Sequence, residues 1–202
     1  MADNGLAFKD YKVSIEGVTP LLMHNGRLAD PTNPHARGMK EISSASRGGM
    51  SDDQFQAMSD LEWEGGMYHD DKGRPVIPGE MIEAALIGGA KKVRLGADAK
   101  IAVMCPDDAA LDYDGPKDYL KLKDKPEFRD VRRVRIQKNA IMRTRPKFNK
   151  WGATLTIRVT KGTKLDDADK VQRMVEDAGM LVGVGDYRPR FGRFVVTDFK
   201  AV

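Results

Sequence analysis

The segment 151–159 shows the pattern that most constrains the fold of this chain, a regular alternation of apolar and polar residues. Every second position is apolar, namely Ala153, Leu155, Ile157 and Val159. Successive side chains of a β-strand point to opposite faces, so these apolar side chains share one face. Residues 10–16 and 193–200 alternate in a similar way. We therefore predict strands that bury one face and expose the other, as in an antiparallel sheet with one covered side.

Two further segments have the spacing of amphipathic helices, with apolar residues three and four positions apart. The first begins near Pro78, where the missing N–H of proline costs no hydrogen bond, and its apolar face comprises Met81, Ile82, Ala85, Leu86 and Ala90. The second begins near Leu165, and its apolar face comprises Val171, Met174, Val175, Ala178 and Met180. Residues 131–143 alternate imperfectly, which predicts a strand with a bulge or a turn near Asn139.

The order of these elements predicts an α+β fold with a ferredoxin-like, RRM-type β-α-β-β-α-β core. Its four-stranded antiparallel sheet carries both helices on one face, and RNA-recognition modules use the other face. Between the first strand and the first helix, residues 25–49 are rich in Gly, Pro, Asn and Ser, which predicts a large insertion after strand 1. Residues 94–126 predict a second, loop-rich insertion. We expect a single RRM-like domain over residues 1–202.

The distribution of charge indicates an anionic partner, although the net charge of the whole chain is only +4. Between Glu127 and Arg158, ten lysines and arginines are opposed by Glu127 and Asp130 alone. Basic residues interleaved with aromatic ones are typical of a groove for single-stranded nucleic acid. The residues predicted to bind here are Arg132, Arg133, Arg135, Lys138, Arg143, Arg145, Lys147 and Trp151. The alternative is an outer strand face whose charges are only solvated.

A second candidate site is the segment 183–193, with the sequence GVGDYRPRFGR. Glycines let backbone N–H groups approach a phosphate closely, and arginines add planar, charged donors. Aromatic rings in the same run can stack on bases. The predicted binding residues are Gly183, Gly185, Tyr187, Arg188, Arg190, Phe191 and Arg193. The alternative is a tight helix-to-strand connection with solvated arginines.

This glycine-rich loop, with its closing Arg190–Arg193 run, resembles that of the RAMP superfamily of CRISPR-associated proteins. The segment Val76–Glu80 at the entry of the first helix is similar to the corresponding entry in backbone subunits of CRISPR effector complexes. The strand at 11–16, followed by Pro20-Leu21-Leu22, fits the same pattern. Phage-borne relatives carry similar endings, so a phage or plasmid origin is compatible with the resemblance.

The resemblance implies an RNA-binding backbone subunit of an antiviral ribonucleoprotein, with an RRM-derived fold. Such subunits polymerise along a single-stranded guide RNA, so the implied partners are further copies of the chain, other effector subunits and a DNA or RNA target. It further implies that residues 25–66 form a thumb-like insertion that kinks the RNA between neighbouring copies.

No cofactor, metal site or catalytic residue is predicted. Cys105 is the single cysteine, which excludes an intramolecular disulfide and favours a reducing, cytoplasmic compartment. The three histidines, at positions 24, 35 and 69, match no ligand spacing. No apolar run approaches the ~20 residues needed to span a bilayer, and the N-terminus lacks the features of a signal peptide.

Three alternatives remain open at this point. The first is a phage or plasmid protein that binds or anneals single-stranded DNA on the same fold. The second is an assembly protein whose basic face meets an acidic neighbour rather than a nucleic acid. The third is a metal-dependent endoribonuclease that uses Asp30, Asp52 or Asp53 of the first insertion.

Overall fold

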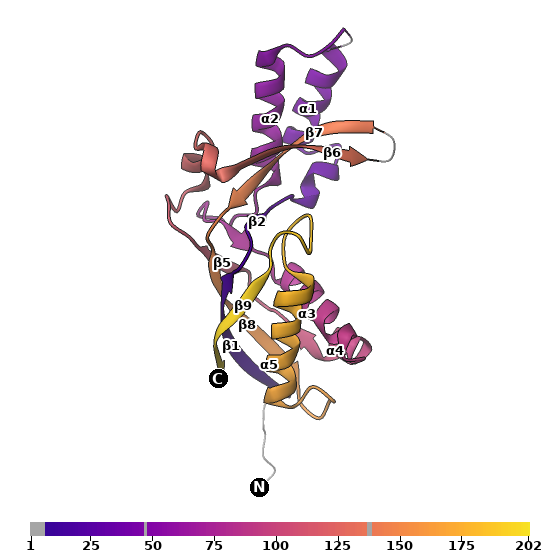
Figure 1. The fold of residues 1–202 in the computed structure, drawn as a ribbon, viewed down its shortest axis with the longest axis vertical. Coiled ribbons are helices and arrows are strands. Elements are labelled where there is room, and N and C mark those ends of the chain that lie inside the picture. Colours follow the sequence, from indigo (N-terminus) through magenta and orange to yellow (C-terminus); the bar gives the residue numbers. More distant parts are fainter. Residues whose placement is uncertain (1–6, 47, 137–138) are drawn as a thin grey trace. The chain divides into compact units, whose positions relative to one another are not determined.

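The computed structural model describes residues 7–46, 48–136 and 139–202, which divide into two compact units (Figure 1). Unit 1 comprises Met1–Leu21, Val76–Asp114 and Lys150–Val202. Unit 2 comprises Leu22–Pro75 and Gly115–Asn149. The predicted class, α+β with antiparallel sheets, is confirmed. The predicted boundaries of a single domain with insertions at 25–66 and 94–126 remain predictions.

Unit 1 is built on a mixed-length antiparallel sheet with the strand order β3-β5-β8-β1-β9. These strands are β1 (Phe8–Gly17), β3 (Val76–Ile77), β5 (Ala109–Asp112), β8 (Gly152–Thr160) and β9 (Phe194–Ala201), and the short β4 (Val103–Met104) also pairs with β8. The two central strands, β1 and β8, pair without interruption from Phe8↔Thr160 to Glu16↔Gly152. Their alternation is the predicted one, since Val13, Leu155 and Ile157 are at most 1% exposed.

Helices α3 (Gly79–Lys92) and α5 (Ala168–Asp177) lie on the same side of this sheet (Figure 1). Both were predicted, and their buried residues include Ile82, Leu86, Val171 and Met174. The chain continues from α5 into η4 (Ala178–Val182), a single π-helical turn, and the short helix α4 (Gly96–Ala102) follows α3. A Cβ atom on Gly89 would lie 2.6 Å from the backbone nitrogen of Ala178. Only glycine therefore allows α3 to approach η4 this closely.

Unit 2 contains a three-stranded sheet with the order β2-β7-β6. Its strands are β2 (Leu21–Leu22), β6 (Arg129–Ile136) and β7 (Asn139–Phe148), and β6 and β7 form an antiparallel hairpin in the register Arg129↔Pro146 to Ile136↔Asn139. Residues 131–143 were predicted to form a strand of the main sheet with a bulge or a turn near Asn139. They lie instead in two paired strands, β6 and β7, of this second sheet, and the alternation breaks where one strand ends and the other begins.

Two helices accompany this hairpin, α1 (Pro34–Ala45) and α2 (Asp52–Gly66). The first lies within residues 25–49, for which no helix was predicted. Its start is capped, since the side chain of Asn33 accepts a hydrogen bond from His35 N, and Pro34 is its first residue. The second begins with a capping box between Ser51 and Gln54. Trp63 of α2 is fully buried, and its indole N–H donates to the carbonyl oxygen of Phe128 at 2.9 Å.

The remaining elements of unit 2 are short helical turns, η1 (Gly26–Ala29), η2 (Tyr119–Leu122) and η3 (Pro126–Phe128). Across the described ranges of the chain, every helix is too short or too polar to cross a membrane.

Candidate nucleic-acid interface

One face of the β6–β7 hairpin carries Arg132, Arg143 and Arg145, which make contacts within unit 2 or are buried there. Arg132 Nε donates to Asp130 Oδ2 at 2.6 Å, and Arg143 Nη1 donates to Glu62 Oε1 at 2.6 Å. Arg145 is only 9% exposed. Asp130 and Glu62 are themselves buried, and the Arg143–Glu62 pair attaches β7 to α2. A phosphate would have to compete with these carboxylates for Arg132 and Arg143.

The opposite face of the hairpin is covered by α2 at one end, where Thr144 is buried against Ser59. Further along the strands it is exposed, cationic and partly apolar. Arg133 lies opposite Met142 across the two strands, and Val131 and Met142 are each 45% exposed. Arg133 and Arg135 are exposed, and within the described part of the chain neither has an ion-pair partner. We call Val131, Arg133, Arg135 and Met142 the hairpin face. It combines charge for phosphates with apolar side chains for bases.

Three predicted residues of this region remain: Lys147, Lys138 and Trp151. Lys147 is half-buried on β7, and Lys138 lies outside the described residues. Trp151 is 3% exposed, at the start of β8. Its indole N–H donates to Thr19 O at 2.9 Å, and its ring lies against Phe194 and the backbone of Gly17. A base cannot stack on this ring in the present arrangement, so Trp151 belongs to the core of unit 1.

The glycines of the 183–193 loop serve the fold of the loop itself. Gly183, Gly185 and Gly192 all have positive φ, between 74° and 81°. A Cβ atom on Gly192 would lie 1.7 Å from Val184 O. The nearby backbone N–H groups are already engaged: Val184 N donates to Gly192 O and Gly192 N donates to Pro20 O, both at 2.9 Å. Gly183 and Gly185 therefore shape the loop, and Gly185 N donates to the sulfur of Met81.

The aromatic and basic residues of the loop divide into supporting and exposed ones. Phe191 is 9% exposed and lies beneath Tyr187, with ring centroids 5.7 Å apart. Arg193 is half-buried, and its Nε donates to Pro189 O at 2.8 Å. Tyr187 is 51% exposed, and Arg188 and Arg190 are exposed too. Three of the predicted side chains are thus accessible to a ligand: Tyr187, Arg188 and Arg190.

A cavity of about 620 Å³ lies beside this loop, and we call it the loop groove. It is lined by Lys91 and Lys92 of α3, Leu181 and Val182 of η4, and loop residues that include Asp186, Tyr187 and Arg188. The two lysines were not predicted as binding residues. The sequence places them at the end of the first predicted helix. It does not show that this end of the helix lies next to the glycine-rich loop.

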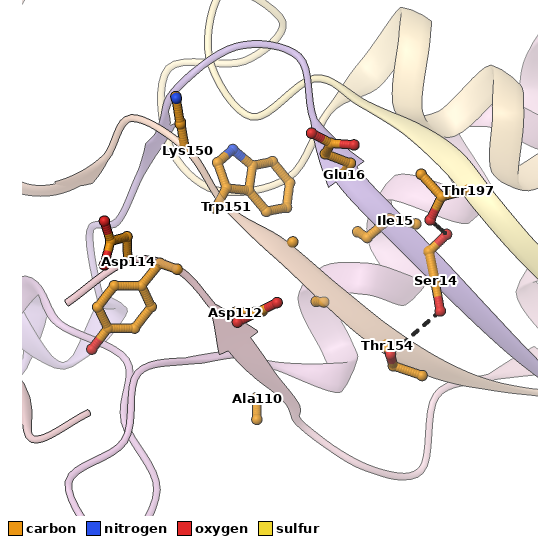
Figure 2. Close-up of a pocket in the computed structure, with 13 residues that line it drawn as sticks. Ser14, Ile15, Glu16, Ala110, Asp112, Asp114, Lys150, Trp151, Thr154 and Thr197 are labelled. Carbon is orange, nitrogen blue, oxygen red and sulfur yellow. Dashed lines mark hydrogen bonds between the residues drawn. The ribbon is translucent and has the colours of Figure 1, made fainter. Parts of the chain in front are cut away.

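The face of the unit 1 sheet opposite the helices has a different character. A cavity of about 890 Å³ on this face is lined by hydroxyl groups of Ser14, Thr154 and Thr197. Figure 2 shows carboxylates around it, on Glu16, Asp112 and Asp114, with Lys150 as the cation among the labelled residues. Carboxylates repel phosphates, so this part of the sheet does not supply the basic surface that the RRM-type comparison led us to expect there.

Histidine, cysteine and aspartate residues that could act in catalysis have structural contacts in the described ranges. No group of three His, Cys, Asp or Glu side chains gathers there as metal ligands would. Burial raises the pKa of the Cys105 thiol to about 12, so this thiol stays protonated at neutral pH. His69 stacks on Tyr119 with ring centroids 4.4 Å apart, and Asp30 accepts hydrogen bonds from Thr32.

Comparison with known proteins finds similar solved structures, but no match in sequence. No family model and no curated protein matches the sequence. Among solved structures, the fold is similar to a chain of the cryo-EM structure of the Type III-B Cmr-beta bound to cognate target RNA, with a TM-score of 0.48 and 12% sequence identity. The similarity covers 97% of this chain and 61% of that one, so this chain spans less than two thirds of the length of its structural relative.

Proposed function

We propose that this chain binds single-stranded RNA as a subunit of a CRISPR-type ribonucleoprotein. The observation that carries the proposal is the hairpin face, where Arg133 and Arg135 are exposed next to two exposed apolar side chains, Val131 and Met142. Cations next to exposed apolar side chains suit a strand whose phosphates and bases are both accessible. A duplex offers its phosphates but keeps its bases stacked, so this surface favours single strands.

The fold supports the same proposal. The elements β1, α3, β5, β8, α5 and β9 follow one another in the order β-α-β-β-α-β, and the sheet order β5-β8-β1-β9 keeps β1 and β8 at the centre. We take these six elements as the ferredoxin-like core, with β5 rather than residues 131–143 as its second strand. The hairpin and the helices of unit 2 are then additions to that core, and the thumb extends beyond residues 25–66 to include the hairpin.

Binding to RNA should depend on Arg133 and Arg135 and much less on the arginines that are paired internally. We expect the double charge reversal R133E/R135E to weaken binding of a labelled single-stranded RNA at least about tenfold. The slope of log affinity against log salt should become shallower by about 1.4, because each lost phosphate contact on a single strand contributes about 0.7. Fluorescence anisotropy between about 50 and 200 mM salt measures both quantities.

A matched control is K40E/K121E, which changes the net charge equally at two exposed lysines of the same unit. Equal losses in the two double variants would mean that RNA responds only to total charge, and the proposal would be wrong. A DNA strand of the same sequence completes the design. Equal affinity for DNA and RNA would favour the DNA-binding alternative, because recognition of RNA requires contacts to the 2′-hydroxyl group.

A further inference from the structure

The loop groove has the size and composition of a site for a small ligand. Its volume of about 620 Å³ falls within the range of small-molecule pockets, roughly 300–1,000 Å³. Leu181 and Val182 give it an apolar wall, while Lys91, Lys92 and Arg188 supply cations. An anionic ligand with a flat apolar part fits this combination.

The conformation of Tyr187 indicates that its side chain has a role beyond the fold of the loop. Its φ of +58° lies in the left-handed region, which costs energy for every residue with a Cβ atom and suits glycine. The same loop already uses glycine with positive φ at positions 183, 185 and 192. A tyrosine that is 51% exposed in such a position is therefore a candidate for ligand contact, since residues in strained conformations concentrate at functional sites.

The ring of Tyr187 is held in place by a second aromatic ring. It stacks on Phe191 at an interplanar angle of 24° and a centroid distance of 5.7 Å, and Phe191 is 9% exposed. One face of the Tyr187 ring thus packs against a buried aromatic residue. Such a supported ring stacks on a planar base with little loss of conformational freedom.

The cations come from a different part of the chain and reach the groove through close helix packing. Lys91 and Lys92 are exposed in the last turn of α3, and within the described ranges neither forms an ion pair. Gly88, one turn earlier, would place a Cβ atom 3.0 Å from Val182 Cγ1. The small residues of α3 therefore bring its lysines beside η4 and the loop.

From these observations we infer that the loop groove binds one nucleotide of a single strand, with its base on Tyr187 and its phosphate on Lys91, Lys92 and Arg188. The inference rests on the proposed function in that the nucleotide belongs to bound RNA, but the groove and the hairpin face share no residue. The carboxylate of Asp186 lines the same groove. It can accept a hydrogen bond from an exocyclic amino group, so adenine, which carries such a group, is the better test base.

The test uses adenosine 5′-monophosphate as the probe, with adenosine and inorganic phosphate as its two halves. Titration is followed by NMR chemical shifts of the full chain. We expect the nucleotide to shift the resonances of Tyr187, Lys91 and Lys92, and to bind more tightly than either half alone. Shifts confined to other residues, or equal affinity for phosphate and nucleotide, would overturn the inference.

Substitutions test the contributions of base stacking and of positive charge to nucleotide binding separately. Tyr187→Asn should weaken nucleotide binding about tenfold, because stacking is lost while asparagine tolerates the left-handed backbone. Tyr187→Phe should bind as the parent protein does, because it keeps the ring. The double reversal K91E/K92E should abolish binding, whereas K100E/K161E, at exposed lysines of the same unit, should not. Normal binding by Tyr187→Asn would refute the stacking role, and equal effects of the two lysine pairs would refute the phosphate site.

The two proposals can fail separately. If the R133E/R135E variant no longer binds long RNA but still binds the nucleotide, both proposals stand. If the parent protein binds long RNA but shows no nucleotide contact at the groove, the nucleotide site fails and the proposed function remains. If the nucleotide binds at the groove but long RNA does not bind, the proposed function fails, and the groove is a site for a free nucleotide rather than for one nucleotide of a strand.

Discussion

Glu62 illustrates how single side chains in unit 2 serve structure rather than binding. Its Oε1 accepts from Arg143 at 2.6 Å and its Oε2 accepts from the backbone N–H of Thr144 at 2.7 Å. Because Glu62 is 5% exposed, removing its carboxylate would leave the buried N–H of Thr144 without its acceptor, at a cost of about 1–3 kcal/mol. Arg143 is thus one half of a contact that anchors β7 to α2.

Gly192 is the residue whose replacement we expect to disrupt the 183–193 loop most. Gly192→Ala combines a positive φ of 74° with a Cβ atom 1.7 Å from Val184 O, so it should lower the free energy of unfolding by more than about 3 kcal/mol. Gly162→Ala is the matched control, because Gly162 has nearly the same φ, 75°, and nothing lies near its Cβ position. It should cost only about 1 kcal/mol. Urea denaturation compares the two, and equal losses would show that the clash with Val184 is relieved by movement of the loop.

At the scale of secondary-structure elements, α1 is less buried than α2, against which it packs. It has no buried residue, and it lies against α2 through close contacts at glycine. A Cβ atom on Gly38 would lie 2.9 Å from Leu61 Cδ1, and one on Gly65 would lie 3.0 Å from His35 Cβ. The side chain of His35 is the polar group placed in this contact, and its buried Nδ1 has no hydrogen-bond partner.

We predict that acidification loosens α1 through His35. Burial, reinforced by the charge of Arg27 and opposed by that of Glu64, lowers the pKa of His35 below its ordinary value of 6.5. The unfolded chain therefore binds a proton at higher pH than the folded one, so the stabilising effect of neutral His35 is complete above pH 6.5 and is lost as the pH falls toward the folded pKa. Hydrogen exchange of α1 at pH about 7.5 and about 5.5 should show the loss of protection.

The control for this prediction is His35→Asn, which removes the titrating group. The variant should lose little additional protection over the same pH interval. Carboxylates whose pKa is lowered, such as Asp30 and Asp70, titrate at lower pH and do not interfere. Equal pH sensitivity in the parent and the variant would assign the effect to another group.

At the scale of the whole molecule, the chain passes between its two units four times along the sequence, at positions near 21, 75, 114 and 149. Each unit has its own sheet, and each carries one exposed cationic surface: the loop groove in unit 1 and the hairpin face in unit 2. Two such surfaces on one chain suit a partner that is longer than either surface, as an RNA strand is.

If copies of the chain assemble in a row on RNA, the number of bound copies should rise stepwise with RNA length. Analytical ultracentrifugation with a series of single-stranded RNAs measures this stoichiometry directly. R133E/R135E should lower the occupancy at every length, while K40E/K121E should not. A single bound copy on every RNA would contradict assembly in a row and leave RNA binding itself in place.

Features that depend on residues close together in the chain could be predicted from the sequence. The alternation over 151–159 and the two amphipathic helices depend on neighbours in the sequence, and the structure has each of them. The helix at Pro34–Ala45 was missed because its start depends on a cap at Asn33 rather than on an apolar face.

The tertiary structure alone decided which charged and aromatic residues are available to a partner. Arg143 meets a carboxylate 81 positions away, and Trp151 meets a carbonyl oxygen 132 positions away, so no local pattern distinguishes them from the exposed Arg133. Lys91 and Lys92 lie beside Tyr187 because helices packed through glycine bring distant segments together. Charge pairing and burial are properties of contacts between distant residues, and those contacts exist only in the folded chain.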